Sequence, residues 1–278
     1  GNVASALGLA VKIAAIDTPE AAAELPADTL PVLPVAWAAN IRAGVPDKDN
    51  APIVINAIRT AAQLAQDGRV SAITTNPIHK AVLIEAGFSH PGHTEFLGSL
   101  APEQDGAPTM MLACDDLRVV PVTGHIPLRD APAALKTTDI IAKGRLLTAT
   151  LRDHFGIVDP RIAVCGLNPH AGENGQFGDE DERIIAPAVT AMQNDNITAF
   201  GPLSADTLFH AEARKTYDAV MGMYHDQVLI PIKTLDFDGG VNVTLGLDFI
   251  RTSPDHGTAL DIAGTGTARH ASLAAAIR

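Results

Sequence analysis

The sequence contains few aromatic residues, few cysteines and only one tryptophan. Aromatic residues make up 4% of the 278 residues, so we expect a core built mostly from Ala, Val, Ile and Leu. The two cysteines, Cys114 and Cys165, are too few for a disulfide framework in a chain of this length. Each lies in an apolar run typical of a buried strand. We therefore expect two buried thiols in the reducing cytoplasm.

Positive charge is also scarce, because the formal net charge is -12. A nucleic-acid-binding protein needs a basic face to neutralise phosphates, so this balance argues against a nucleic-acid partner. It argues equally against electrostatic attachment to a membrane. No apolar run reaches the ~18 residues that a membrane-spanning helix needs. The opening "GNVASALGLAVKIAAI" has no basic segment, so we do not interpret it as a signal peptide.

Apolar periodicities of strands and helices alternate along the chain, which favours an α/β fold with a largely parallel sheet. The helices expected are 51–66, one beginning at Lys80, 138–155, 180–193 and a final one in "ARHASLAAAIR"; the strands are 70–74, 109–114, 117–122, 161–167, 219–222 and 241–245.

Histidines occur in three of the loops that follow predicted strands. His125 stands in "TGHIPL", His170 in "LNPHAGENG" and His225 in "MYHDQ". The carboxyl ends of strands form the ligand crevice of open α/β sheets, where the three could meet. Three neutral imidazoles are typical of a catalytic site for Zn²⁺ or a similar divalent ion. Asp226 could orient one imidazole. The alternative is that each histidine is a separate loop residue.

Groups that could bind an anion gather in two further stretches. Lys233, Asn242 and Arg251 lie in an otherwise acidic region and have the chemistry to bind phosphate or carboxylate. The alternative places Lys233 and Arg251 on a solvated surface. His93 and Thr94, in "PGHTEFLG", either hydrogen-bond a polar substrate or cap the helix "EFLGSL".

The stretch "DHGTALDIAGTG", residues 255–266, is rich in glycine and precedes the final helix. It does not contain the G-x-G-x-x-G pattern of a Rossmann dinucleotide site. From this stretch alone, a loop that simply leads into the helix is an open alternative to a cofactor-binding loop.

Taken together, the motifs resemble those of the 4-hydroxythreonine-4-phosphate dehydrogenase family of pyridoxal phosphate biosynthesis. The matching stretches run from about residue 70 to the C-terminus; they are "TNPIHK", "GHTEFL", "TGHIPL", "LNPHAGE", "GPLSADTLF", "YHDQ" and "HGTALDIAGTG". The last also resembles the adenosine-binding loop of isocitrate and isopropylmalate dehydrogenases, whose fold this family shares.

The resemblance implies two α/β/α domains with an active-site cleft between them, as in isocitrate and isopropylmalate dehydrogenases. We expect residues 1–95 and 246–278 to form the first, discontinuous domain, and residues 96–245 the second. It further implies a homodimer with the active site at the subunit interface, where both subunits contribute metal ligands.

The resemblance also assigns roles to individual residues. It implies that a divalent metal (Zn, Mg or Co) is bound by His125, His170 and His225. It implies that His93, Thr94, Lys233, Asn242 and Arg251 contact a small phosphorylated substrate. It implies that NAD or NADP is bound by His256, Gly257, Thr258, Ala259, Asp261 and Gly264.

The expected reaction is oxidation of 4-phosphohydroxy-L-threonine to a β-keto acid that decarboxylates to 3-amino-2-oxopropyl phosphate. Asp206 and Lys80 are candidates for the catalytic base, and both can also be read as structural residues. The alternatives are a family member that oxidises a four-carbon sugar-acid phosphate or an aromatic dihydrodiol, and a phosphate acyltransferase of the same fold.

The beginning of the chain departs from the family pattern. The family begins with a strand and a "GDPAGIGPE"-like loop, which this sequence does not contain, and its first 50 residues match only loosely. We therefore expect the N-terminal strand of the first domain to be missing, and a non-catalytic homologue is a third interpretation.

Overall fold

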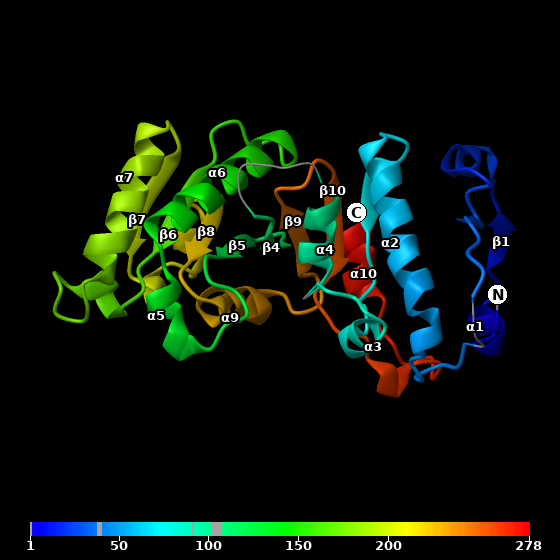
Figure 1. Cartoon of the computed structure of the whole chain (residues 1–278). Coiled ribbons are helices and arrows are strands. Elements are labelled where there is room, and N and C mark those ends of the chain that lie inside the picture. Colours follow the sequence, from blue (N-terminus) through cyan, green and yellow to red (C-terminus); the bar gives the residue numbers. More distant parts are fainter. Residues whose placement is uncertain (1, 38–40, 91, 102–106) are drawn as a thin grey trace. The chain divides into compact units, whose positions relative to one another are not determined.

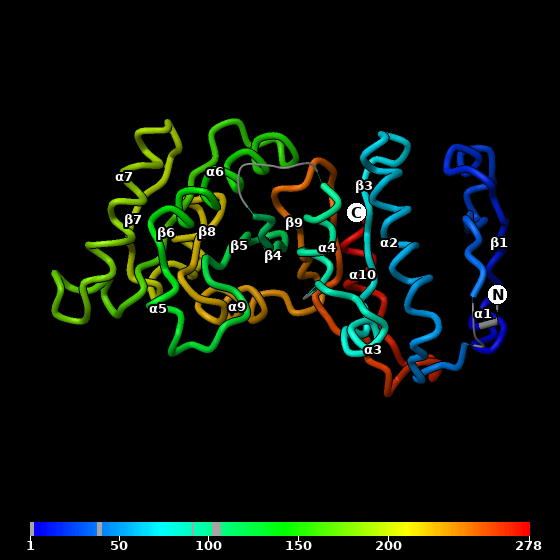
Figure 2. Tube along the Cα trace, in the orientation of Figure 1, coloured from blue at the N-terminus to red at the C-terminus, as the bar shows by residue number. Residues whose placement is uncertain are grey.

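The computed structural model describes residues 2–37, 41–90, 92–101 and 107–278 (Figure 1). The chain divides into two compact units, Gly1–Pro102 with Leu247–Arg278, and Glu103–Gly246. The trace in Figure 2 leaves the first unit before β4 and returns to it after β9. The first unit is thus discontinuous in sequence. The two units divide at 102/103 and 246/247, whereas the predicted domain boundaries are 95/96 and 245/246.

The first unit contains a long helix and two pairs of parallel strands. Its central helix, α2, has Pro52 in its first turn and ends before Gly68, whose φ of +68° suits a residue without a side chain. Its buried residues Ile58 and Ala62 pack with Ile73 of β3 and Leu97 of α4 in one hydrophobic cluster. β3 pairs in parallel with β10, and β1 pairs in parallel with β2.

The elements of this unit are α1 (Asn2–Ala6), β1 (Lys12–Ala15), η1 (Pro19–Glu24), β2 (Thr29–Val32), η2 (Lys48–Asn50), α2 (Ala51–Gln66), β3 (Ala72–Thr74), α3 (Lys80–Glu85), α4 (His93–Leu100), β10 (Ile250–Pro254), η7 (Leu260–Ile262) and α10 (Ala271–Ile277).

The second unit is a sheet with strand order β9-β4-β5-β8-β6-β7. β5, β8, β6 and β7 run parallel, whereas β4 is antiparallel to both of its neighbours, β5 and β9. The expected largely parallel sheet is therefore mixed in this unit. The tight Asp115-Asp116 turn explains the difference, because two strands joined by two residues can pair only in antiparallel fashion.

The elements of the second unit are β4 (Thr109–Cys114), β5 (Leu117–Pro121), η3 (Leu128–Asp130), α5 (Ala131–Ala134), α6 (Thr137–Asp153), β6 (Arg161–Cys165), η4 (Pro169–Gly172), η5 (Asp181–Ile185), α7 (Ala186–Asn194), β7 (Thr198–Leu203), η6 (Ala205–Thr207), α8 (Ala211–Arg214), β8 (Ala219–Gly222), α9 (His225–Leu235) and β9 (Val241–Leu245).

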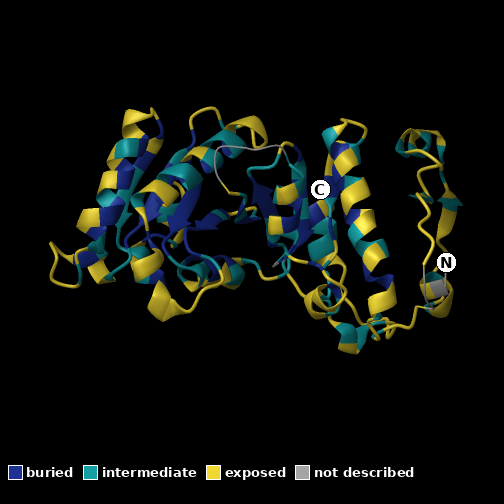
Figure 3. Cartoon of the chain, viewed as in Figure 1, coloured by how far each residue is buried: buried dark blue, intermediate teal, exposed yellow. Residues whose placement is uncertain are grey.

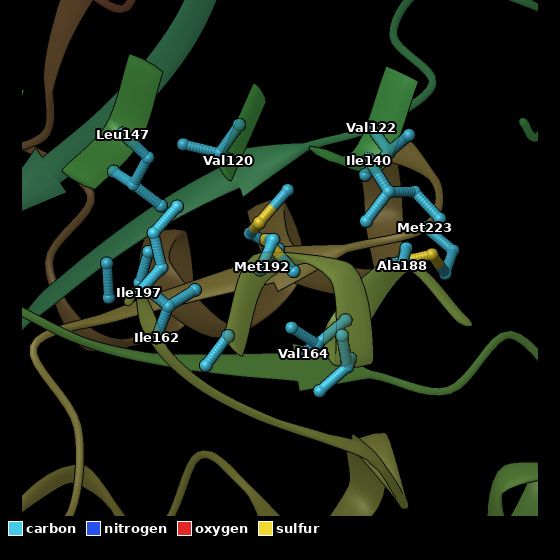
Figure 4. Close-up of a cluster of buried hydrophobic side chains, with 14 of the residues drawn as sticks. Val120, Val122, Ile140, Leu147, Ile162, Val164, Ala188, Met192, Ile197 and Met223 are labelled. Atoms are coloured by element: carbon cyan, nitrogen blue, oxygen red, sulfur yellow. The ribbon is translucent and has the colours of Figure 1, made fainter. Parts of the chain in front are cut away.

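Helices cover both faces of this sheet. Successive strand residues point to opposite faces, so apolar residues along one strand pack against helices on both sides. Val164 of β6 belongs to one hydrophobic cluster with Leu147 of α6 and Met192 of α7, and Figure 4 shows side chains of this cluster. Its neighbour Ala163 belongs to a second cluster, with Val228 of α9. The strands are mostly buried while the outer sides of α6 and α7 are exposed (Figure 3). The second unit is therefore an α/β/α sandwich.

Several elements differ from the expectations. The predicted helix 180–193 begins as a π-helix, Asp181–Ile185, and continues as α7. The sequence did not predict β2, β7 or β10. Cys165 is buried as expected, but Cys114 is half-buried, because it stands last in β4 at the turn. Within the described residues, no helix combines the length and the hydropathy needed to cross a membrane.

Candidate active site

Two of the three predicted metal-binding histidines lie close together in the second unit. His125 follows β5, and His225 is the first residue of α9, directly after β8. Their ring centroids are 5.2 Å apart. Both line a cavity of about 210 Å³ together with Tyr224 and Asp226. The prediction that His225 belongs to a loop is wrong, because the helix begins at this residue.

A small hydrogen-bonded framework holds these strand ends in register. Thr123 donates its hydroxyl to the carbonyl of Met223, 2.7 Å away. The side-chain oxygen of Gln227 accepts from the Met223 amide at 2.7 Å, and its nitrogen donates to the carbonyl of Gly166 at 2.7 Å. The ends of β5, β8 and β6 are therefore tied together directly beneath the loops that carry the histidines.

The His225 imidazole is oriented by its neighbour in sequence. Its Nδ1 lies 2.7 Å from Asp226 Oδ1, and because a carboxylate can only accept, Nδ1 carries the proton and Nε2 has its lone pair available. An imidazole polarised in this way is a typical metal ligand. His125 and His225 thus fit two ligand positions of a divalent-metal site, and Asp226 orients the second of these histidines.

His170 is presented differently. It lies in η4 with a φ of 53°, its side chain is exposed, and its ring is 6.2 Å from that of Phe177. Among the residues that the structure describes, no group of three or more His, Cys, Asp or Glu side chains is arranged to hold a metal ion. The three-histidine site therefore stays a prediction.

The first unit contains a buried cationic group. Arg251 on β10 is 4% exposed, and its Nε and Nη2 donate to the Thr75 hydroxyl at 3.2 and 2.7 Å. Burial lowers its pKa to about 10, so it is still charged at neutral pH. The alternative that Arg251 sits on a solvated surface is wrong, because the β3–β10 pairing carries it into the unit.

His93 lies within the electrostatic reach of this arginine. Burial lowers the pKa of His93 to about 4, and the charges of Arg251 and Lys80 act in the same direction. His93 is therefore neutral at physiological pH and can donate or accept a hydrogen bond. Thr94 follows it in the first turn of α4 and is half-buried. The capping alternative for both residues is wrong, because Gly92 occupies the N-cap position.

The other two predicted anion-binding residues belong to the second unit. Lys233 lies on α9, where it lines a groove with His225. Asn242 lies on β9, and its Oδ1 is buried without a hydrogen-bond partner among the described residues. Burying an amide oxygen without a hydrogen-bond partner costs free energy. The unpaired Oδ1 of Asn242 is therefore consistent with a hydrogen bond to a ligand.

The two candidate bases belong to different units. Lys80 is the first residue of α3 in the first unit, beside Gly92. Asp206 is exposed in η6 of the second unit and accepts a hydrogen bond from Ser204.

The predicted cofactor loop borders a cavity of about 270 Å³ in the first unit. Thr258 and Leu260 line it, and Trp37 contributes an aromatic wall. Ala259 is left-handed, with a φ of 44°. The other predicted members of the loop, His256, Gly257, Asp261 and Gly264, are exposed. An aromatic surface next to half-buried Thr258 has the character of a site for a planar ligand.

The family model described as "Pyridoxal phosphate biosynthetic protein PdxA" matches residues 2–278. The chain belongs to this family. A 4-hydroxythreonine-4-phosphate dehydrogenase of Bradyrhizobium diazoefficiens is 53% identical over 99% of this chain and 80% of its own length. One from Caulobacter vibrioides is also 53% identical, over 98% of this chain and 83% of its own length.

A solved structure has the same fold. The crystal structure of 4-hydroxythreonine-4-phosphate dehydrogenase from Klebsiella pneumoniae superposes with a TM-score of 0.90, at 40% identity, and covers 99% of this chain and 84% of that one. The predicted membership of the PdxA family and the predicted fold class are thus confirmed.

Sequence reasoning missed several residues of this PdxA-family chain that shape the candidate site. Thr75 and Gln227 lie in motifs that drew attention, and Asp181 lies in the predicted helix 180–193, but none of these patterns identifies their hydrogen-bond partners; Thr75 and Arg251, for example, are 176 residues apart. No sequence signal identified Trp37 as part of a cavity wall.

The low pKa of His93 has a measurable consequence for stability. A neutral His93 stabilises the fold fully above the unfolded-state pKa of 6.5, and this contribution is lost as the pH falls toward the folded-state pKa of about 4. As the pH falls from 6.5 to about 4, the free energy of unfolding should therefore decrease more in the wild type than in His93→Gln, by at most ~3 kcal/mol. Urea unfolding at a series of pH values measures this. An identical pH dependence in both proteins would contradict the burial of a neutral His93.

Proposed function

We propose that this chain catalyses the NAD-dependent oxidation of 4-phosphohydroxy-L-threonine in the cytoplasm. The product is a β-keto acid, which decarboxylates to 3-amino-2-oxopropyl phosphate. Relatives 53% identical over almost the whole chain carry the name of this activity. The structural observation that carries the proposal is the buried, charged Arg251 beside a neutral His93.

Arg251 binds the substrate phosphate in this proposal. Arg251 is 4% exposed and still charged at neutral pH, so its guanidinium can form charge-assisted hydrogen bonds with an anion. The Thr75 hydroxyl accepts from two of its nitrogens and so fixes the plane of the guanidinium. A fixed guanidinium plane matches the geometry of phosphate oxygens. His93 and Thr94 add neutral hydrogen-bonding groups in the first unit, and Lys233 and Asn242 are the candidate substrate contacts of the second unit.

A divalent metal is held by His125 and His225 in this proposal, with His170 supplied by the second subunit of a homodimer. When bound, such an ion supplies Lewis acidity at the substrate hydroxyl and at the product ketone. Asp226 keeps the proton on Nδ1 of His225, which directs Nε2 toward the ligand position. The framework of Thr123, Met223 and Gln227 keeps the two histidine-bearing strand ends at a fixed separation.

The nicotinamide cofactor, NAD or NADP, binds along residues 256–264 in this proposal. The cavity of about 270 Å³ beside Thr258 and Leu260 would receive its adenosine end, against Trp37. The base that takes the hydroxyl proton is Lys80 or Asp206. Lys80 lies within electrostatic range of His93, so it belongs to the same part of the first unit as the phosphate-binding groups.

The activity itself is tested with purified protein, NAD, a divalent metal and 4-phosphohydroxy-L-threonine. We expect NADH absorbance to rise, and a much smaller rise with unphosphorylated 4-hydroxy-L-threonine at equal concentration, since Arg251 then has no phosphate to bind. Formation of an acyl phosphate with coenzyme A in place of NADH would contradict the proposal and assign the chain to phosphate acyl transfer.

The metal site is tested by elemental analysis of single variants. His125→Ala, His170→Ala and His225→Ala should each lose most of the bound metal and most of the activity, while NAD binding is largely retained. His154→Ala changes an exposed histidine at the end of α6 and serves as the matched control. Full metal content in His170→Ala would mean that His170 is only a loop residue.

A further inference from the structure

The loop that carries His170 closes around a buried carboxylate with no role in the chemistry described so far. Asp181, in the π-helical turn before α7, is 1% exposed. In the described part of the chain, no salt bridge involves Asp181. Burying a carboxylate without a cation is costly, so its hydrogen bonds must compensate for the lost hydration.

Those hydrogen bonds all reach back to the end of β6. Oδ1 accepts from the Leu167 amide at 2.8 Å, and Oδ2 accepts from the Asn168 amide at 3.2 Å. Oδ2 also accepts from the Asn168 side chain at 3.0 Å, and that side chain donates at 2.8 Å to Glu180. One carboxylate therefore fixes the two peptide groups directly before Pro169 and His170.

The surrounding backbone leaves little room for any other arrangement. A Cβ atom on Gly166 would lie 2.7 Å from Asp181 Oδ1, and one on Gly172 would lie 3.3 Å from Oδ2. Both glycines thus allow the chain to approach the carboxylate closely. The turn between them passes through left-handed conformations at His170 (φ 53°) and Ala171 (φ 52°). Residues with side chains rarely adopt this conformation unless their surroundings impose it.

We propose that Asp181 is a positioning residue: its buried carboxylate anchors the Leu167-Asn168 peptides and so imposes the left-handed turn that presents His170 to the divalent metal. This inference rests on the proposed metal site. Asp181 acts through the backbone and does not touch the metal or the substrate itself.

The test is titration of Zn²⁺ into the metal-free dimer, with dissociation constants for the wild type, Asp181→Asn and His170→Ala. Asp181→Asn keeps the shape of the side chain but replaces one acceptor oxygen by a donor that faces amide hydrogens. We expect Zn²⁺ affinity to fall about tenfold or more, as for other groups that orient metal ligands. Asn168→Ala, which keeps the carboxylate but removes its side-chain partner, should weaken Zn²⁺ binding less, and it serves as the second variant should Asp181→Asn not fold.

Two controls separate positioning from general destabilisation. Asp179→Asn changes an exposed acid of the same loop, paired with Arg183, and should leave Zn²⁺ affinity unchanged. Ile185→Val makes a small cavity in the core next to the same turn and should lower Tm without weakening Zn²⁺ binding. NAD affinity should stay at the wild-type value in all variants.

The outcomes distinguish this inference from the proposed function. Undiminished Zn²⁺ affinity in His170→Ala would overturn the metal site and, with it, the role of Asp181. Loss of affinity in His170→Ala with wild-type affinity in Asp181→Asn would overturn the positioning role alone. The positioning role would also be overturned if Ile185→Val and Asp181→Asn lowered Tm equally and weakened Zn²⁺ binding equally.

Discussion

The hydrogen bonds around Met223 are the constraint on which the candidate metal site depends. Thr123 and Gln227 both bond to the backbone of Met223, and Gln227 extends the connection to Gly166. The parallel sheet alone would bring three strand ends to one edge, but loops at that edge could still move independently. These side chains join the strand ends and so support the arrangement in which the His125 and His225 ring centroids lie 5.2 Å apart.

Each unit contains a buried charged side chain on which one of the proposals depends. Arg251 in the first unit and Asp181 in the second are 4% and 1% exposed. Asp181 accepts hydrogen bonds from neutral amide groups, and Arg251 donates to the Thr75 hydroxyl. In the proposed function Arg251 presents its charge to an anion, whereas Asp181 uses its carboxylate to shape a turn. The proposals thus use buried charge once for recognition and once for geometry.

The strongly periodic parts of the fold could be predicted from the sequence. The bounds of α2, β4, β8 and β9 agree with the expected ranges, because long or uniformly apolar segments follow a single period. The helix at His225 was missed because its first residues are polar and Pro231 interrupts its interior. The motifs identified the histidines and the cationic residues, but not Thr75, Gln227 or Asp181 as their supports. Those contacts depend on how segments remote in sequence pack, which no local pattern contains.

Recognition of the substrate phosphate by Arg251 is the central claim, and steady-state kinetics of Arg251→Ala test it most directly. The variant should raise KM for 4-phosphohydroxy-L-threonine by roughly tenfold or more, since a hydrogen bond to a charged group contributes ~1.5–3 kcal/mol. Its kcat/KM for the unphosphorylated substrate and its NAD affinity should stay close to those of the wild type. An unchanged KM for the phosphorylated substrate would contradict the account, because the buried guanidinium would then have no part in binding the phosphate.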